Sequence, residues 1–152
     1  MFVDTREKKP FKFAGQPTVD VHKLDVGDYC LSGGGFNKIF VERKGEEDFK
    51  NTMSNQIERF EKEVERCRHM GAYMFVVVER TVPMIFKNNF FGGFNHNLDW
   101  VFHNTRKFQQ KYKDCCQFVF TENKKSAAFA TQALLQNGPD IKGHDINLFY
   151  KF

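Results

Sequence analysis

Residues 27–48 read GDYCLSGGGFNKIFVERKGEED, a run that mixes β-branched and aromatic residues with charged ones. The three glycines at 33–35 are typical of a tight turn, and the residues on either side favour extended structure. The stretch therefore predicts two antiparallel strands, at 28–32 and 37–44. Neither Gly-Lys-Ser nor Gly-Lys-Thr follows the glycines, so a hairpin turn explains them better than a phosphate-binding P-loop.

Charged side chains of both strands are expected to meet at one place. Side chains alternate between the faces of a strand, so Glu42 and Lys44 project to one side and Arg43 to the other, while Asp28 lies alongside on the neighbouring strand. Two carboxylates near one lysine are costly unless a further positive charge neutralises them. Mg²⁺ binds to a few carboxylate oxygens and retains several waters. We therefore predict a Mg²⁺ site formed by Asp28, Glu42 and the backbone carbonyl of Arg43.

A metal held in this way predicts a reaction. It polarises a phosphodiester and lowers the pKa of a bound water, while Lys44 orients that water or stabilises the developing charge. The inferred reaction is phosphodiester hydrolysis. Considered alone, the D…E-x-K spacing is common, and a surface hairpin with a Glu42–Lys44 pair is the simpler interpretation of it.

A longer pattern favours the enzyme. The residues G-D at 27–28 and E-R-K-G-E-E-D at 42–48 resemble the G-D…E-R-K-x-x-x-D signature of the XPF family of structure-specific endonucleases. VDTRE at 3–7 resembles the first-strand motif of that family, and NQIERFEKEVERC at 55–67 resembles the helix that follows its signature. Segments 73–79 and 117–134 are also similar to later strands and the last helix of the domain, so the resemblance covers most of the chain.

The resemblance implies a fold and a set of functional residues. The fold is a nuclease domain of the PD-(D/E)XK type, a restriction-endonuclease-like α/β fold with a mixed central sheet flanked by helices, and one domain spans residues 1–152. The implied ligands of Mg²⁺ or Mn²⁺ are Asp28 and Glu42, and Lys44 is catalytic. Asp4 is implied to be either a second-metal ligand or a hydrogen-bond partner. The remaining implied site residues are Glu7 at the edge, Asp48 in support, and Arg43 and Arg59 shaping the site or touching phosphate.

The rest of the chain continues the α/β pattern. Residues 1–4 predict a first strand, and residues 18–44 predict a three-stranded meander. Beyond them the alternating periodicities predict helices at 51–71, 97–112 and 123–138 and strands at 72–79 and 116–121, with the strand at 72–79 parallel to its predecessor and an irregular segment at 80–96.

Composition limits the class of protein. The chain has 152 residues, 41% of them hydrophobic and 28% charged, which suits one globular domain. The run at 73–78 is too short to cross a membrane, and the N-terminal residues lack the apolar segment of a signal peptide. We therefore expect an intracellular protein, cytoplasmic or with DNA in a nucleoid or nucleus, that is neither secreted nor bound to a membrane.

The cysteines and histidines add no predicted site. The four cysteines (Cys30, Cys67, Cys115 and Cys116) include no C-x-x-C pair, and the adjacent Cys115 and Cys116 cannot form an ordinary disulfide with each other without strain, so reduced thiols are expected. The five histidines are scattered without metal-ligand spacing, which argues against zinc.

Positive charge indicates an anionic partner. The formal net charge is +4, and lysines and arginines gather in several clusters. We expect DNA to be the partner, bound mainly through its backbone.

In the segment 80–96, phenylalanines 90, 91 and 94 either stack on unpaired bases or fill the core beneath a lid. The candidate DNA-binding residues are Arg59, Lys8, Lys87, Lys107 and Lys111.

The resemblance also leaves alternatives open. Many relatives continue into a tandem helix-hairpin-helix domain that dimerises and grips DNA, and no such repeat is present here. We expect its role to be supplied by a homodimer, by the chain's own basic clusters with the segment 80–96, or by a DNA-targeting partner protein. The predicted function is a metal-dependent endonuclease that cuts branched or distorted DNA or nicks one strand of a duplex. The alternatives are an inactive DNA-binding or protein-binding module on the same fold, and a sequence-specific or junction-resolving endonuclease.

Overall fold

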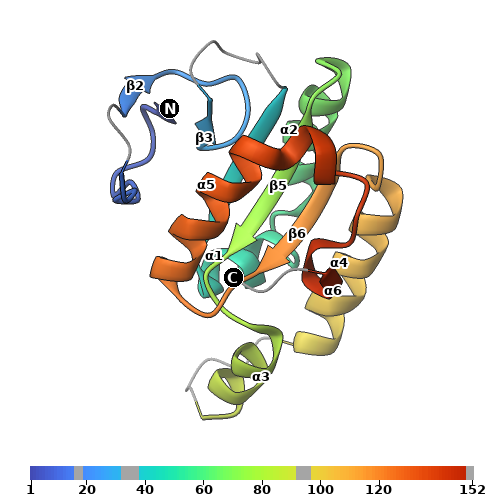
Figure 1. The fold of residues 1–152 in the computed structure, drawn as a ribbon. Helices are drawn as coiled ribbons and strands as arrows, with labels where there is room; N and C mark the ends of the chain where they lie inside the picture. The colour runs from blue at the N-terminus through green and yellow to red at the C-terminus, as the bar shows by residue number, and fades with distance from the viewer. Residues whose placement is uncertain (16–18, 32–37, 92–96, 150–152) are drawn as a thin grey trace.

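The computed structural model describes residues 1–15, 19–31, 38–91 and 97–149, and within these ranges the strands form one mixed six-stranded sheet in the order β2-β1-β3-β4-β5-β6 (Figure 1). The strands are β1 (Phe2–Asp4), β2 (Asp20–His22), β3 (Tyr29–Cys30), β4 (Ile39–Lys44), β5 (Tyr73–Val78) and β6 (Cys116–Phe120). The helices are α1 (Glu46–Thr52), α2 (Ile57–His69), α3 (Val82–Phe91), α4 (Leu98–Lys111), α5 (Lys124–Ile141) and α6 (Ile146–Phe149).

The centre of the sheet is parallel and covered on both faces. All residues of β5 are buried, and β5 pairs in parallel with both β4 and β6. This confirms the strand and the direction predicted from the apolar run at 72–79, because a strand covered on both faces carries apolar side chains at successive positions.

Two helical layers cover the sheet (Figure 1). One core cluster joins α1, α2 and α4 to one face, through residues such as Phe49, Phe60 and Phe108. The other joins α5 and α6 to the opposite face and includes Phe11 from the segment after β1. Because side chains alternate along β4, Phe40 belongs to the first cluster and Val41 to the second, so each residue of this strand is assigned to one layer.

The predicted meander at 18–44 is wrong in its first strand. Strands β3 and β4 pair antiparallel as expected, but β2 pairs in parallel with β1, which separates it from β3. The residues of β2 are exposed, which suits the edge of the sheet. Alternation along the chain reports the exposure of a strand but not its neighbour, and the chain crosses from β1 to β2 before it returns to β3.

The helix predicted at 51–71 is two helices. Helix α1 begins directly after β4 with three acidic residues in its first turn, which stabilise the positive end of the helix dipole. The chain then turns at residues 53–56, where the amides of Asn55 and Gln56 both donate to the carbonyl of Asn51, and α2 follows. Gly71, with a φ of 62°, ends α2 as predicted, since glycine tolerates the left-handed conformation.

Three helices, α3, α5 and α6, differ from the predictions. Residues 82–91 of the predicted irregular segment form α3, which is anchored by the buried Ile85. Residues 92–96, including Phe94, and the side chains of Phe90 and Phe91 lie outside the described part of the chain, as do the glycines at 33–35. Helix α5 continues past Gly138 to Ile141, and α6 was not predicted.

Gly138 serves close packing and does not end a helix. A Cβ at this position would lie 2.9 Å from Cγ1 and Cγ2 of Ile39, so only glycine lets α5 approach β4 this closely. The contact between α5 and β4 therefore explains Gly138, although local sequence signals predicted that this glycine ends a helix.

Two further predictions, about the cysteines and about membrane-spanning segments, can be compared with the described residues. The four cysteines lie buried as free thiols, as predicted. Among the described helices, none combines the length and the apolar character needed to span a membrane.

Candidate active site

The β3–β4 pairing positions Asp28 against β4. The amide of Asp28 donates to the carbonyl of Val41 at 2.9 Å, and Oδ2 of Asp28 accepts from the amide of Arg43 at 2.8 Å. Gly27 has a φ of 68°, and a Cβ there would lie 3.1 Å from the carbonyl oxygen of Val41. The glycine of the G-D motif is thus required for the close approach that places the Asp28 carboxylate at the edge of β4.

Glu42 and Lys44 lie on the same face of β4, as predicted. Nζ of Lys44 donates to Oε1 of Glu42 at 2.6 Å, and the side chains are 12% and 11% exposed. The ammonium also lies 5.0 Å from the ring centroid of Phe60 on α2. The aromatic ring and the carboxylate together hold Lys44 in one orientation.

Asp28, Glu42 and Lys44 together carry too little positive charge to balance the two carboxylates. Burial raises the pKa of Glu42 to about 8, with a further increase from the charge of Asp28. Burial also raises the pKa of Asp28 to about 6, although the Arg43 amide and Lys44 oppose the increase. Burial alone lowers the pKa of Lys44, but attraction to Glu42 raises it above its usual value. One ammonium therefore does not neutralise the carboxylates around it.

The donor set fits a divalent cation that retains water. Within the described residues, no three His, Cys, Asp or Glu side chains form a ready-made metal centre. The hydrogen bonds recorded there engage one oxygen each of Asp28 and Glu42, which leaves the second oxygen of each for another ligand. The carbonyl of Arg43 points to the same edge of β4 as its amide, toward Asp28, because both groups of a strand residue face one neighbour. Two carboxylates and a carbonyl suit Mg²⁺, which keeps several waters.

A cleft of about 220 Å³ opens beside these residues, between β4 and the helices α1 and α2. Asp48 on α1 and Arg59 on α2 are exposed at its rim, so the structure brings both predicted residues to the same cleft as Glu42 and Lys44. The full lining is Glu42, Lys44, Asp48, Thr52, Gln56, Arg59, Phe60 and Glu63.

Glu63 is a site residue that the sequence analysis missed. Its Oε1 accepts from the amide of Gly27 at 3.0 Å, and its charge raises the pKa of both Asp28 and Glu42. The sequence did contain a signal for Glu63. This residue lies one helical turn after Arg59 and next to the apolar stripe of α2 that includes Phe60. A carboxylate at the border of a buried stripe indicates a polar partner on the facing element.

The side chain of Arg43 points to the opposite face of the sheet. It forms ion pairs with Glu79 and with Glu7, the latter at 3.2 Å, and donates to the carbonyl of Lys9 at 2.7 Å. Its guanidinium lies 4.5 Å from the ring centroid of Phe11. Arg43 and Glu7 therefore support β4 from behind, and Arg43 contacts Asp28 through its backbone amide and not through its side chain.

Asp4 is buried, and both of its carboxylate oxygens accept hydrogen bonds. Its donors are the amide of Arg6 at 2.8 Å, Nε of Arg6 at 2.6 Å, Nη2 of Arg6 at 3.2 Å and the amide of Leu24 at 2.7 Å. Burial raises its pKa, but the hydrogen bonds from Arg6 and Leu24 outweigh that effect and lower the pKa below the usual value. Of the two roles expected for Asp4, the geometry favours that of a hydrogen-bond partner.

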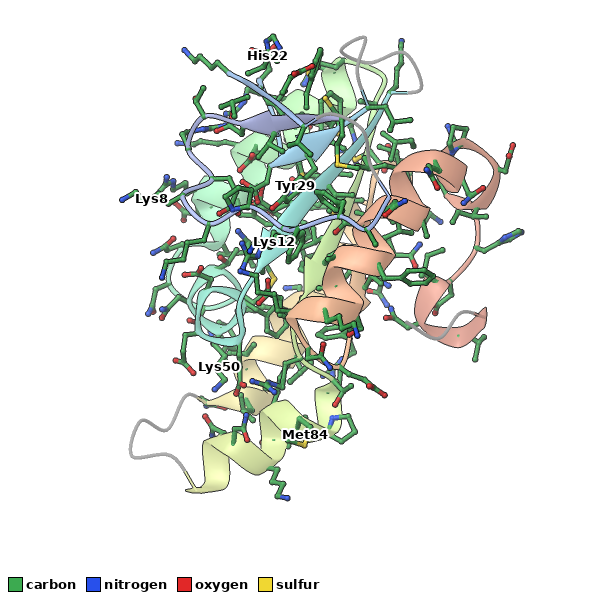
Figure 2. The ribbon with its side chains drawn as sticks, turned by 60° about the vertical axis from the view of Figure 1, so that its left-hand side comes forward. Lys8, Lys12, His22, Tyr29, Lys50 and Met84 are labelled. Atoms are coloured by element: carbon green, nitrogen blue, oxygen red, sulfur yellow. The ribbon has the colours of Figure 1, made fainter. Side chains whose placement is uncertain are left out.

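The predicted DNA-binding lysines are exposed. Lys8 projects from the segment after β1 (Figure 2), Lys87 belongs to α3, and Lys107 belongs to α4. Lys111, at the end of α4, pairs with Glu61 at 3.0 Å and lies 5.0 Å from the ring centroid of Tyr112. Its charge is partly compensated, so the exposed lysines are not equivalent.

Comparisons with known proteins identify a family for the chain. The sequence model of the ERCC4 domain matches residues 3–131, which run from within β1 through β6 to the first turns of α5. The chain belongs to the ERCC4 domain family. A comparison with curated proteins found no match.

Solved structures confirm the fold of this ERCC4 domain. XPF from Aeropyrum pernix in complex with DNA matches with a TM-score of 0.64 and 21% identity, over 90% of this chain and 63% of that chain. XPF from Aeropyrum pernix also matches with a TM-score of 0.61 and 21% identity, over 93% and 67% of the two chains. The restriction-endonuclease-like fold expected from the signature is thus confirmed. The ERCC4 domain spans about two thirds of the XPF chains that it matches.

Proposed function

We propose that this ERCC4 domain is a divalent-metal-dependent DNA endonuclease that cuts branched or distorted DNA or nicks one strand of a duplex. The observation that carries the proposal is the convergence of Asp28 and Glu42, from neighbouring strands, on one edge of β4 with Lys44 beside them. Membership of the ERCC4 family and the likeness to an XPF solved in complex with DNA support the same conclusion.

The charged residues in and beside the cleft have distinct roles in this proposal. Asp28, Glu42 and the carbonyl of Arg43 hold Mg²⁺ or Mn²⁺, which when bound polarises the phosphodiester and lowers the pKa of a water ligand. Lys44 keeps Glu42 oriented and presents a positive charge to the phosphate as negative charge develops on it. Glu63 fixes the Gly27 amide and hence the Asp28 carboxylate.

The rim of the cleft serves substrate binding. Arg59, at the rim, contacts backbone phosphate, which positions the DNA without reading its sequence. Asp48, at the start of α1, supports the rim opposite Arg59. Lys8, Lys87, Lys107 and Lys111 add attraction to DNA that weakens as the salt concentration rises.

The test is nicking of supercoiled plasmid by the purified chain, titrated with Mg²⁺ or Mn²⁺. We expect relaxed circles with the wild type and none with the Glu42→Gln variant. The matched control is Glu58→Gln, which alters an exposed carboxylate on α2 and should cleave like the wild type. Cleavage by Glu42→Gln at the wild-type rate, or a folded wild type that binds DNA but never cuts it, would reject the proposal.

A panel of labelled flaps, forks, four-way junctions and linear duplex then defines the substrate. We expect cuts near branch points. Discrete positions on linear duplex would instead indicate a sequence-specific enzyme, and symmetrical cuts on four-way junctions a junction-resolving one.

A further inference from the structure

A second concave surface lies on the opposite face of the sheet from the cleft. It is a groove of about 540 Å³ between residues 10–14 and the first two turns of α5. Figure 2 shows Lys12 on the segment that forms one wall. The groove is mainly apolar, and the residues that line it are Pro10, Phe11, Lys12, Phe13, Ala14, Lys124, Lys125, Ala128, Phe129 and Gln132.

The wall formed by residues 10–14 is firmly anchored. The ring of Phe11 stacks on Tyr29 with centroids 5.3 Å apart, and the amide of Phe11 donates to the Tyr29 hydroxyl at 3.1 Å. Phe13 packs edge-on against both rings. The other face of Phe11 meets the guanidinium of Arg43. The wall is therefore preformed, which reduces the entropic cost of binding a ligand against it.

The rim of the groove is positive. Lys12 stands on one wall, and Lys124 and Lys125 stand on the other. Among the described residues, none of these three ammonium groups takes part in a recorded ion pair. The first turn of α5 also holds no acidic residue, although cations are unfavourable at the positive end of a helix. A rim that the fold itself does not neutralise is complementary to an anionic ligand.

The groove also presents an aromatic surface to solvent. Phe129 on α5 is 64% exposed, although apolar groups of this size gain free energy when they leave water. Phosphates spaced along a chain, with flat bases between them, match lysines at the rim and phenylalanines in the groove, and stacking of this kind does not depend on the base.

The position of the groove connects it to the cleft. Lys44, Val78 and Phe120 are aligned at the carboxyl ends of β4, β5 and β6, and α5 begins four residues after Phe120. Both concave surfaces therefore lie at the same end of the sheet, on opposite faces. Arg43, between Glu42 and Lys44 on β4, contacts the groove residue Phe11.

We propose that the groove between residues 10–14 and α5 binds a single-stranded nucleic-acid segment. Lys12, Lys124 and Lys125 contact its phosphates, and a base stacks on Phe129. The inference rests on the proposed function in taking the occupant to be an unpaired arm of a DNA substrate whose duplex part lies at the cleft. A preference for branched DNA follows, because fully paired DNA offers no base to this groove.

The test is fluorescence anisotropy of labelled dT12 in EDTA, with the full chain. The variants are Phe129→Ala and Lys124→Gln/Lys125→Gln, and the matched controls are Leu148→Ala, at another exposed apolar residue, and Lys142→Gln, at the other end of α5. Loss of base stacking in Phe129→Ala is expected to weaken binding about five-fold or more. The double lysine variant should reduce the slope of log K against log salt by about 1.4, since each phosphate contact on a single strand contributes about 0.7.

Each other outcome rejects the inference. If groove variants bind dT12 like the wild type, the groove is not the binding site. If a labelled Glu-rich peptide with one phenylalanine binds more tightly than dT12 and shows the same dependence on Phe129, the groove takes an acidic protein partner. If sedimentation shows a dimer that Phe129→Ala dissociates, while dT12 binding is unaffected, the groove is an interface between copies of this chain.

Failure of this inference is distinguishable from failure of the proposed function, because binding in EDTA requires no cleavage. Groove-dependent binding of dT12 by a chain that never nicks plasmid would reject the nuclease proposal alone. Nicking that requires Glu42, without any dependence of dT12 binding on the groove, would reject this inference alone.

Discussion

Nζ of Lys44 lies 2.6 Å from Oε1 of Glu42, two positions earlier on the same strand, and both side chains are largely shielded from solvent. Because the ammonium of Lys44 is held in this way, its positive charge has a fixed position in the cleft. We expect Lys44→Met to reduce Mg²⁺-dependent nicking by about 10²- to 10⁴-fold, because the loss of one positioned acid, base or charge-stabilising group typically costs this much.

The control for Lys44→Met is Lys62→Met, which removes an exposed lysine of α2. Anisotropy with duplex DNA should show that both variants still bind. Equal nicking rates for Lys44→Met and Lys62→Met would remove Lys44 from the mechanism.

Stability of the metal-free protein should depend on pH in a defined direction. The pKa values of Asp28 and Glu42 are raised to about 6 and about 8, so the folded state binds protons more tightly than the unfolded chain between about pH 4 and pH 8. The free energy of unfolding therefore falls as pH rises through this window. The decrease is expected to be several kcal/mol, measured by urea unfolding in EDTA at pH 5 and pH 8.5.

Glu42→Gln tests the source of this dependence. The amide cannot ionise, so the variant should lose most of the pH dependence and be more stable than the wild type at pH 8.5 in EDTA. Identical pH profiles for the variant and the wild type would show that Glu42 is not the titrating group.

Metal binding should reverse the cost of these charges. A cation that binds only the folded state with a Kd of about 1 mM adds about 1.4 kcal/mol at 10 mM, which raises the Tm of a domain this size by a few degrees. We expect this increase with Mg²⁺ at pH 8 for the wild type and for Glu58→Gln, and its loss in Asp28→Asn. A Tm that is insensitive to Mg²⁺ and Mn²⁺ in the wild type would contradict the metal site.

Asp4 is expected to contribute to stability and not to the chemistry. Asp4→Ala leaves the amides of Arg6 and Leu24 without their acceptor, so the free energy of unfolding should fall by about 2–4 kcal/mol. Cleavage per folded molecule should stay close to that of the wild type. Chemical denaturation and nicking assays on the same sample separate the two effects, and a stable but inactive Asp4→Ala would restore the role of metal ligand.

Gly138 and Ile39 are expected to be coupled. Gly138→Ala improves helix propensity by about 1 kcal/mol, but overpacking of a core typically costs about 1–3 kcal/mol, and the new Cβ would meet Ile39 at 2.9 Å. We expect net destabilisation that Ile39→Val partly relieves, seen in a double-mutant cycle by urea unfolding. Additive effects of the two substitutions would show that α5 moves away to make room.

Local patterns determined much of this protein. The alternation of residues 37–44 separated the side chains of Glu42 and Lys44 from that of Arg43 correctly, because extended backbone assigns successive side chains to opposite faces regardless of what surrounds them. The apolar run at 72–79 predicted a covered parallel strand for the same reason. The G-D…E-R-K signature identified the fold through its resemblance to a family, and its glycine meets a steric need, the close approach of Gly27 to Val41.

Only the tertiary structure decided which distant segments meet. Strand β2 joined β1 because the order of strands depends on how the chain crosses the sheet, which alternation does not encode. Glu63 entered the site through the amide of Gly27, and Asp4 turned its carboxylate to the amide of Leu24, both through contacts between segments far apart in sequence. The groove beside Phe129 likewise forms where residues 10–14 meet α5. Periodicity specifies the face of an element, whereas a site is formed by several elements, and their relative placement is fixed by packing.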